Sequence, residues 1–298
     1  MSQPASGSGE PGVAVPAGSG PTVRRILLGS QLRRLRERND ISREDAGHHI
    51  RASESKISRL ELGRVGFKKR DVEDLLTLYR VTDHAERAHV LTLVREANQQ
   101  GWWQPYADVL PSWFQPYIDL EESASLIRSY ELQFVPGLLQ TEEYARAVMS
   151  RRPGVPKDVI DGRVDVRMTR QKLLTRPDAP RLWMVIDEAA LRRRIGGRRI
   201  ARTQIAHLLA LTDHPALTLQ VTPFAAGSHA ADGGAFSILR FPDPDLTDLV
   251  YLERLTGASY LDKRDDVDEY SIAMNQLCLD SATPDSTTGI LHEITKTL

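Results

Sequence analysis

The chain has 298 residues, of which 41% are hydrophobic and 27% are charged, and its formal net charge is -1. These values are ordinary for a globular protein, and the length favours two domains over one. A single cysteine, Cys278, excludes a disulfide framework and a cluster of thiolate metal ligands. No apolar run is long enough to cross a membrane and no signal-peptide pattern is present, so we expect a cytoplasmic protein.

The charges are unevenly distributed along the chain. Between Thr22 and Arg80 there are 15 Lys and Arg against 9 Asp and Glu, whereas the rest of the chain has 24 against 31. A basic segment attached to an acidic one is expected when only one domain contacts phosphates. Residues 1–22 are mostly Gly, Pro, Ser and Ala, a composition that predicts a disordered tail.

Residues 42–62 predict two short helices joined by a tight turn. Ser42 and Asp45 have the spacing of a variant capping box, and Ser53 is the expected N-cap of the second helix. Apolar residues at helical spacing pack the two helices together: Ala46, Ile50, Ile57 and Leu60. This arrangement is typical of a helix-turn-helix, whose second helix enters the major groove of DNA.

The outer face of the second helix is basic and rich in hydrogen-bonding groups. We expect base contacts from Ser55, Lys56 and Arg59, because Lys and Arg suit the acceptors of guanine and Ser suits donors or acceptors. Phosphate contacts are expected from a further basic and polar set: Ser42, Arg43, Arg64, Lys68 and Lys69. Helices predicted before and after this pair complete an all-α five-helix domain over residues 23–100.

The run ISREDAGHHIRASESKISRLELGR resembles the helix-turn-helix of the lambda-repressor-like, xenobiotic-response-element (XRE) family. The resemblance extends over the flanking helices and implies binding to double-stranded DNA. One difference is Arg51, because the family usually has Gly in this turn. If the backbone is left-handed there, a non-glycine residue costs about 1–2 kcal/mol.

Residues 101–117 form an aromatic junction that contains Trp102, Trp103 and Trp113. Lys and Arg are absent from it, which disfavours stacking on single-stranded nucleic acid. We interpret these tryptophans as part of a hinge between domains that also contacts a partner. The alternative is that they form the wall of a ligand pocket.

Residues 118–298 predict a mixed α/β domain, so the overall class is α+β. Strands are expected at Leu182–Ile186, Leu217–Val221, Phe236–Phe241 and Leu249–Leu252. Helices are expected at Glu122–Tyr130, Thr141–Ser150, around Ile160–Met168, at Arg199–Leu211, at Val267–Leu279 and after Thr283.

Polar residues of this domain match no known arrangement for catalysis. The candidates are Asp187 with Glu188, His207 with His214, and His229 near Asp232. Their spacing matches neither a metal site nor a nucleophile motif. We therefore expect no enzymatic activity, no catalytic residue, no metal and no cofactor.

Four runs of the C-terminal half carry a second resemblance: IRSYELQFVPGLLQTEEYARAV, RLWMVIDEAALRRRIGG, VTPFAAGSHAADGGAFSILRFPDPD and VYLERLTGASYLD. They resemble the domain of unknown function that follows the helix-turn-helix in actinobacterial regulators of the WhiJ type. Members of that group resemble antitoxins, and their genes often lie beside one for a small acidic protein. The resemblance implies a regulator of development or antibiotic production with a small acidic partner.

We therefore expect a nucleoid-associated regulator that binds a palindromic operator as a homodimer, because one recognition helix covers only a few base pairs. The C-terminal domain would dimerise and receive a signal. One alternative is an antitoxin-like interaction protein that sequesters a small partner, with autoregulatory DNA binding. A second alternative is a regulator that responds to a small molecule.

Overall fold

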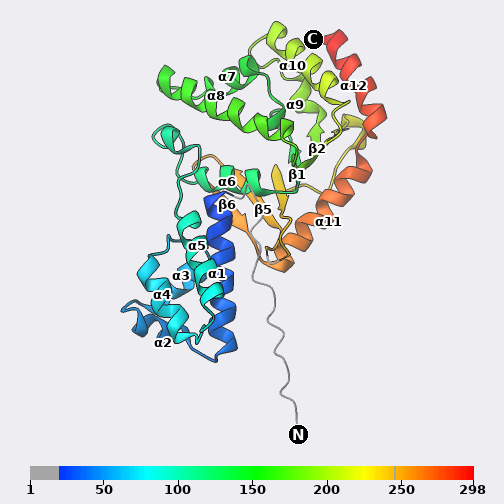
Figure 1. Ribbon diagram of the computed structural model, residues 1–298. Helices are drawn as coiled ribbons and strands as arrows, with labels where there is room; N and C mark the ends of the chain where they lie inside the picture. Colours follow the sequence, from blue (N-terminus) through cyan, green and yellow to red (C-terminus); the bar gives the residue numbers. More distant parts are fainter. Residues whose placement is uncertain (1–19, 245) are drawn as a thin grey trace. The chain divides into compact units, whose positions relative to one another are not determined.

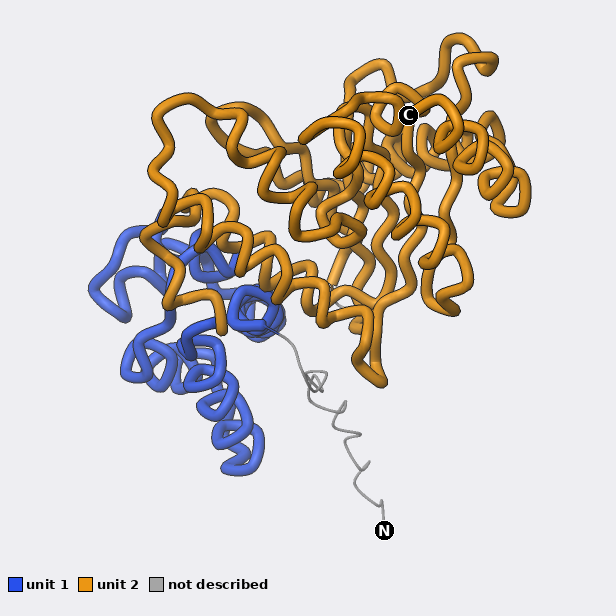
Figure 2. Tube along the Cα trace, turned by 90° about the horizontal axis from the view of Figure 1, so that it is seen from above, with its two compact units in different colours: residues 1–101 blue, residues 102–298 orange. Residues whose placement is uncertain are grey.

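The computed structural model of the protein describes residues 20–244 and 246–298. The chain divides into two compact units, with the boundary between Gly101 and Trp102 (Figure 2). Most of the predicted disordered tail lies outside the described residues, but its last two residues begin the first helix. No helix in these two described ranges is long and apolar enough to cross a membrane.

Unit 1 is the predicted all-α domain (Figure 1). In its described part the helices are α1 Pro21–Arg38, α2 Arg43–His49, α3 Glu54–Glu61, α4 Lys69–Leu78 and α5 His84–Ala97. One apolar core joins them and includes Leu32, Ile57, Leu76 and Val90. The all-α, five-helix prediction is therefore confirmed.

The crossing of α1 and α3 depends on a glycine. A Cβ atom placed on Gly29 of α1 would lie 2.4 Å from the carbonyl oxygen of Leu60 in α3. Because that atom belongs to the backbone, it cannot move aside easily. Gly29 therefore allows the two helices to approach closely, and this approach fixes α3 on the domain.

Unit 2 is built around a six-stranded mixed sheet with the order β3-β2-β1-β4-β5-β6. The strands are β1 Leu126–Glu131, β2 Arg181–Asp187, β3 Leu217–Thr222, β4 Phe236–Arg240, β5 Leu249–Arg254 and β6 Gly257–Leu261. β1 pairs in parallel with β2, as does β2 with β3, whereas β4, β5 and β6 continue the sheet with antiparallel pairs. This architecture confirms a mixed α/β C-terminal domain.

Helices surround this sheet (Figure 1). They are α6 Gln115–Ser123, α7 Glu142–Met149, α8 Lys157–Gln171, α9 Glu188–Arg192, α10 Arg198–Leu211, α11 Arg264–Asp280 and α12 Pro284–Thr297. Helix α11 packs Met274 and Leu277 against the apolar sheet residues Val185, Ile238 and Val250. Short 3₁₀ turns connect several elements: Gln104–Tyr106, Gly137–Leu139, Lys172–Thr175 and Phe224–Ala226.

The helix predicted at Glu122–Tyr130 is wrong. Helix α6 ends at Ser123, and Leu126–Glu131 instead forms β1 between β2 and β4. Arg128 and Ser129 interrupt the apolar pattern of this strand, so its period of two is hard to read from the sequence. Pairing on both sides overrides the local helical preference.

The aromatic segment is packed into unit 2. Trp103 belongs to an apolar cluster with Leu110, Ile118 and Val166. Its indole N–H donates a hydrogen bond to the buried Asp119 carboxylate at 2.7 Å. The compact unit thus begins at Trp102, whereas the predicted domain began at residue 118 after a separate junction.

Candidate nucleic-acid interface

Two serine caps hold the helix-turn-helix. The Ser42 hydroxyl accepts a hydrogen bond from the Asp45 amide at 3.0 Å and lies 2.7 Å from the Asp45 carboxylate, to which it donates. The Ser53 hydroxyl accepts from the Lys56 amide at 3.2 Å. Both caps occur where the sequence predicts them, and each satisfies a free amide in the first turn of its helix.

The turn between α2 and α3 contains a strained residue. Arg51 has a φ of 56°, in the left-handed region, and the following Ala52 amide donates to the Gly47 carbonyl at 2.8 Å. The turn therefore has the conformation that glycine adopts freely, and Arg51 adopts it at a cost of about 1–2 kcal/mol.

The packing residues predicted for this motif lie in the core of unit 1. Ala46, Ile57 and Leu60 are at most 2% exposed, and Ile50 is 9% exposed. Their burial leaves the opposite side of α3 in water. Glu54, Ser55 and Arg59 are exposed on that side.

Lys56 is less accessible than its neighbours on α3. Its ammonium group lies 2.6 Å from the carboxylate of Asp71, and the Lys56 side chain is 32% exposed. A base contact by Lys56 would require this ion pair to open. Glu54 is also exposed and directly follows the N-cap Ser53, but the predicted set of base contacts did not include it. Its position in the first turn of α3 could have indicated it, because the N-terminal residues of a recognition helix reach the bases.

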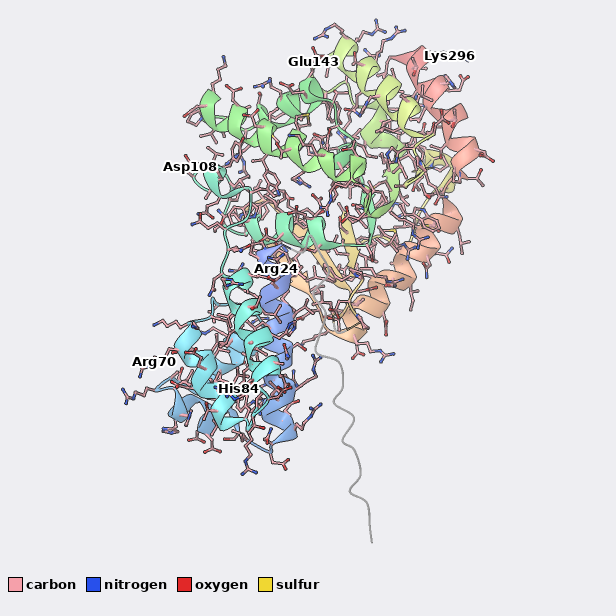
Figure 3. The ribbon with its side chains drawn as sticks, in the orientation of Figure 1. Arg24, Arg70, His84, Asp108, Glu143 and Lys296 are labelled. Carbon is pink, nitrogen blue, oxygen red and sulfur yellow. The ribbon has the colours of Figure 1, made fainter. Side chains whose placement is uncertain are left out.

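The predicted phosphate-contacting residues fall into two groups. Arg64 and Lys68 are exposed, and neither forms an ion pair with a carboxylate in the described part of the chain. Lys69 is also exposed, with its ammonium group 3.6 Å from the Glu73 carboxylate. Arg70, at the same end of α4, extends outward from the helix (Figure 3). Arg64 and Lys68 can therefore approach a phosphate backbone directly, whereas Lys69 and Arg70 lie 3.6 and 3.9 Å from the carboxylates of Glu73 and Asp74.

Ser42 and Arg43 already have partners. The Ser42 hydroxyl is occupied by Asp45, and the Arg43 Nε lies 3.0 Å from the Glu61 carboxylate. A phosphate contact from either residue would therefore require an exchange of partners.

A buried ion cluster connects α1, α2 and α3. Arg36 and Glu61 are each 6% exposed, and the Arg36 guanidinium contacts both Glu61 carboxylate oxygens, at 2.5 and 3.2 Å. Arg36 also donates to the Ile41 carbonyl at 2.7 Å. The hydrogen bond to Glu61 is the main cause of a raised Arg36 pKa, although burial opposes it. Sequence reasoning missed this cluster because its residues are far apart in the chain.

Unit 2 brings together two of the polar candidates considered for catalysis. The Tyr130 hydroxyl lies 2.9 Å from His229 Nε2 and 3.5 Å from an Asp187 carboxylate oxygen. These groups stand at the carboxyl ends of β1 and β2, although His229 is distant in sequence. Among the described residues no group of His, Cys, Asp and Glu has the arrangement of a metal site.

The predicted hinge tryptophans have separate environments. Trp103 is buried against Asp119, as described above, and Trp102 lines a cavity between α6 and α8. The Trp113 carbonyl accepts a hydrogen bond from the Tyr260 hydroxyl at 2.7 Å. All three therefore contact the body of unit 2.

Comparison with known families agrees with this geometry. Residues 27–90 match a family described as a helix-turn-helix domain, which indicates a DNA-binding regulator. Residues 114–293 match the family described as a domain of unknown function, DUF5753. Because this match covers more than half of the chain, the protein belongs to the DUF5753 family. No curated protein and no solved structure matches the chain.

Proposed function

We propose that the protein is a sequence-specific transcription regulator that reads double-stranded DNA with the exposed face of α3. The observation that carries the proposal is the rigid presentation of this face: capped helix ends, a close α1–α3 crossing and the Arg36–Glu61 cluster support Glu54, Ser55 and Arg59. Arg59 suits a guanine, and Glu54 suits the amino group of a cytosine. Phosphate contacts come from Arg64, Lys68 and Lys69.

Selection of bound duplexes from a random pool tests this proposal, because the operator sequence is not needed in advance. Arg59→Ala should lower affinity for the selected site by about tenfold or more, with a smaller loss on a scrambled duplex. Arg95→Ala is the matched control, since Arg95 is an exposed arginine on α5, away from α3. If Arg59→Ala weakens both duplexes equally, Arg59 contacts phosphate only.

The regulator acts as a homodimer on a palindromic operator in the cytoplasm, associated with the nucleoid. This part of the proposal rests on the small number of base pairs that one recognition helix can cover. Unit 2 supplies the dimer contacts. Sedimentation of the protein, free and bound to the selected duplex, tests the stoichiometry, and a monomer in both conditions would refute it.

Unit 2 receives its signal from a small acidic protein and thereby controls genes of development or antibiotic production. An exposed arginine group supports this choice: Arg193, Arg198 and Arg202 lie around the start of α10, and none of them forms an ion pair with a carboxylate in the described ranges. The neighbouring Arg199 pairs with Glu143, which marks this surface in Figure 3. Isolated cations on an otherwise acidic unit favour an acidic protein over DNA.

Charge reversal at these three arginines should abolish co-purification of such a partner. In the alternative, an antitoxin-like protein binds its partner through the same arginines, but the consequence of binding differs. In that case the partner's toxicity is neutralised, and DNA binding regulates only the protein's own gene.

A further inference from the structure

A cavity of about 180 Å³ lies between α6 and α8 at the start of unit 2. Its apolar wall is formed by Ile118, Leu173 and the Trp102 indole, and the other lining residues are polar or charged. A dry apolar cavity of about 150 Å³ is large enough to bind benzene. The cavity can therefore hold one six-membered ring together with a small substituent.

A closed ion pair forms one side of the cavity. Arg170 and Glu121 line it, are 8% and 2% exposed, and are joined by two hydrogen bonds of 2.7 and 2.6 Å. The Arg170 guanidinium also lies over the rings of Phe114 and Tyr117, at 5.1 and 5.6 Å from their centres. Because these two charges satisfy each other, this side is rigid and offers no free charge to a ligand.

The remaining charged residues of the cavity differ in what they can offer. The Arg176 guanidinium is held by Asp178, with hydrogen bonds of 2.9 and 2.6 Å, and lies 3.6 Å from the Glu122 carboxylate. The Lys172 ammonium is exposed and has no partner in the described ranges of the chain. Lys172 is therefore the cation that remains for a ligand.

Glu122 already has partners within the cavity wall. Burial raises the pKa of its carboxyl, whereas the Arg176 charge and a hydrogen bond from Trp102 lower it. These contacts occupy Glu122, so it is poorly placed to attract a cation. An added positive charge would also be repelled by Lys172.

We propose that this cavity binds a compact monocarboxylate that carries one six-membered ring. The ring lies against Trp102, Ile118 and Leu173, and the carboxylate pairs with Lys172. The proposal goes beyond the DNA-binding function and does not depend on it.

Titration calorimetry on the full chain tests the proposal, with benzoate and cyclohexanecarboxylate as probes. Benzyl alcohol and benzylamine have a similar size without the negative charge. Both carboxylates should bind more tightly than benzyl alcohol, by about fivefold at most, because only they can pair with the exposed Lys172 ammonium. Benzylamine should not bind. Equal binding of benzoate and benzyl alcohol, or no heat from either carboxylate, would overturn the proposal.

Three variants locate the site. Lys172→Met should remove the preference for benzoate over benzyl alcohol, whereas Lys157→Met, at an exposed lysine that begins α8, should retain it. Thr169→Phe should fill the cavity and abolish binding of both carboxylates.

Tryptophan emission provides a second measure of binding, which uses the parent protein and so does not depend on the stability of the lysine variants. Benzoate should change the emission of the parent protein, and Trp102→Phe should remove most of that change while the heat of binding persists. An unchanged emission response in Trp102→Phe, or an equal effect of Lys172→Met and Lys157→Met, would place the ligand elsewhere and refute the assignment. DNA affinity is measured without these probes, so a failure of carboxylate binding leaves the proposed DNA-binding function untouched.

Discussion

The ammonium group of Lys56 on α3 and the carboxylate of Asp71 on α4 form an ion pair of 2.6 Å. The pair joins the recognition helix to the helix that follows it. It also neutralises a cation on the helix that we propose reads DNA. Asp71 is thus placed to influence how strongly, and how selectively, the domain binds DNA.

The first prediction concerns this pair. Asp71→Asn should raise affinity for selected and scrambled duplexes alike and steepen the salt dependence, because it releases one cation towards the phosphates. Lys56→Met should cost less than Arg59→Ala on the selected site. Fluorescence anisotropy over a range of salt concentrations measures both. A loss for Lys56→Met that is large and confined to the selected site would instead show that Lys56 leaves Asp71 to contact a base.

The second prediction concerns the strained turn. Arg51→Gly should stabilise unit 1 by about 1 kcal/mol, because glycine adopts a positive φ without a steric penalty and loses only part of that gain in chain entropy. Lys68→Gly is the contrasting control. Lys68 has a φ of -82°, so a glycine there relieves no strain and should lower the stability of unit 1. Urea unfolding followed by far-ultraviolet circular dichroism measures both. A destabilised Arg51→Gly would mean that the arginine side chain contributes more than the backbone strain costs.

The third prediction concerns the buried ion cluster. Glu61→Gln should destabilise unit 1 by about 3 kcal/mol, because the buried Arg36 then loses its main negative partner and keeps only the half-exposed Glu37, at 3.3 Å. Glu73→Gln is the control: its partner Lys69 is 3.6 Å away and both side chains are exposed, so its loss should cost less than about 1 kcal/mol. Equal effects of the two substitutions would show that Glu61 is compensated from elsewhere. All four tryptophans lie after residue 101, so circular dichroism, rather than tryptophan fluorescence, reports this change.

Local signals in the sequence predicted much of this structure. The caps at Ser42, Ser53 and Thr141 depend on neighbouring amides, so their spacing was sufficient to locate three helix starts. The apolar strands β2 and β3 were also visible, since both are buried and bounded by turn residues. By contrast, β6 was not predicted, because each residue of this edge strand is partly exposed and the strand lacks an apolar run.

Contacts distant in sequence could not be predicted in this way. The pairing of Arg36 with Glu61 and that of Lys56 with Asp71 depend on how α1, α3 and α4 pack. The same holds for the meeting of Tyr130 with His229 at the end of the sheet. Sequence spacing identifies which residues face outward on a helix, but the tertiary fold decides which of their charges are already paired.

The last prediction concerns the pH dependence of unit 2. Burial raises the pKa of Glu131, at the end of β1, from 4.5 to about 8; the Glu253 charge adds to this effect, and Arg167 opposes it. Between these two values the folded protein holds a proton that the unfolded chain has lost. The stability that depends on this proton is therefore complete below pH 4.5 and is lost as the pH rises to about 8. Since the side chain keeps partial contact with water, we expect the free energy of unfolding to fall by about 2 kcal/mol, less than the full linkage value.

The variant Glu131→Gln tests this expectation because it has no proton to lose. Its free energy of unfolding should match that of the parent protein at low pH and exceed it by this amount at high pH. Thermal unfolding followed by tryptophan fluorescence across this range tests the sign, with Glu269→Gln on the exposed face of α11 as the control. The opposite result would be a parent protein whose unit 2 becomes more stable as the pH rises through this range, with no such gain in Glu131→Gln. That result would show that the fold stabilises the charged form of the Glu131 carboxylate.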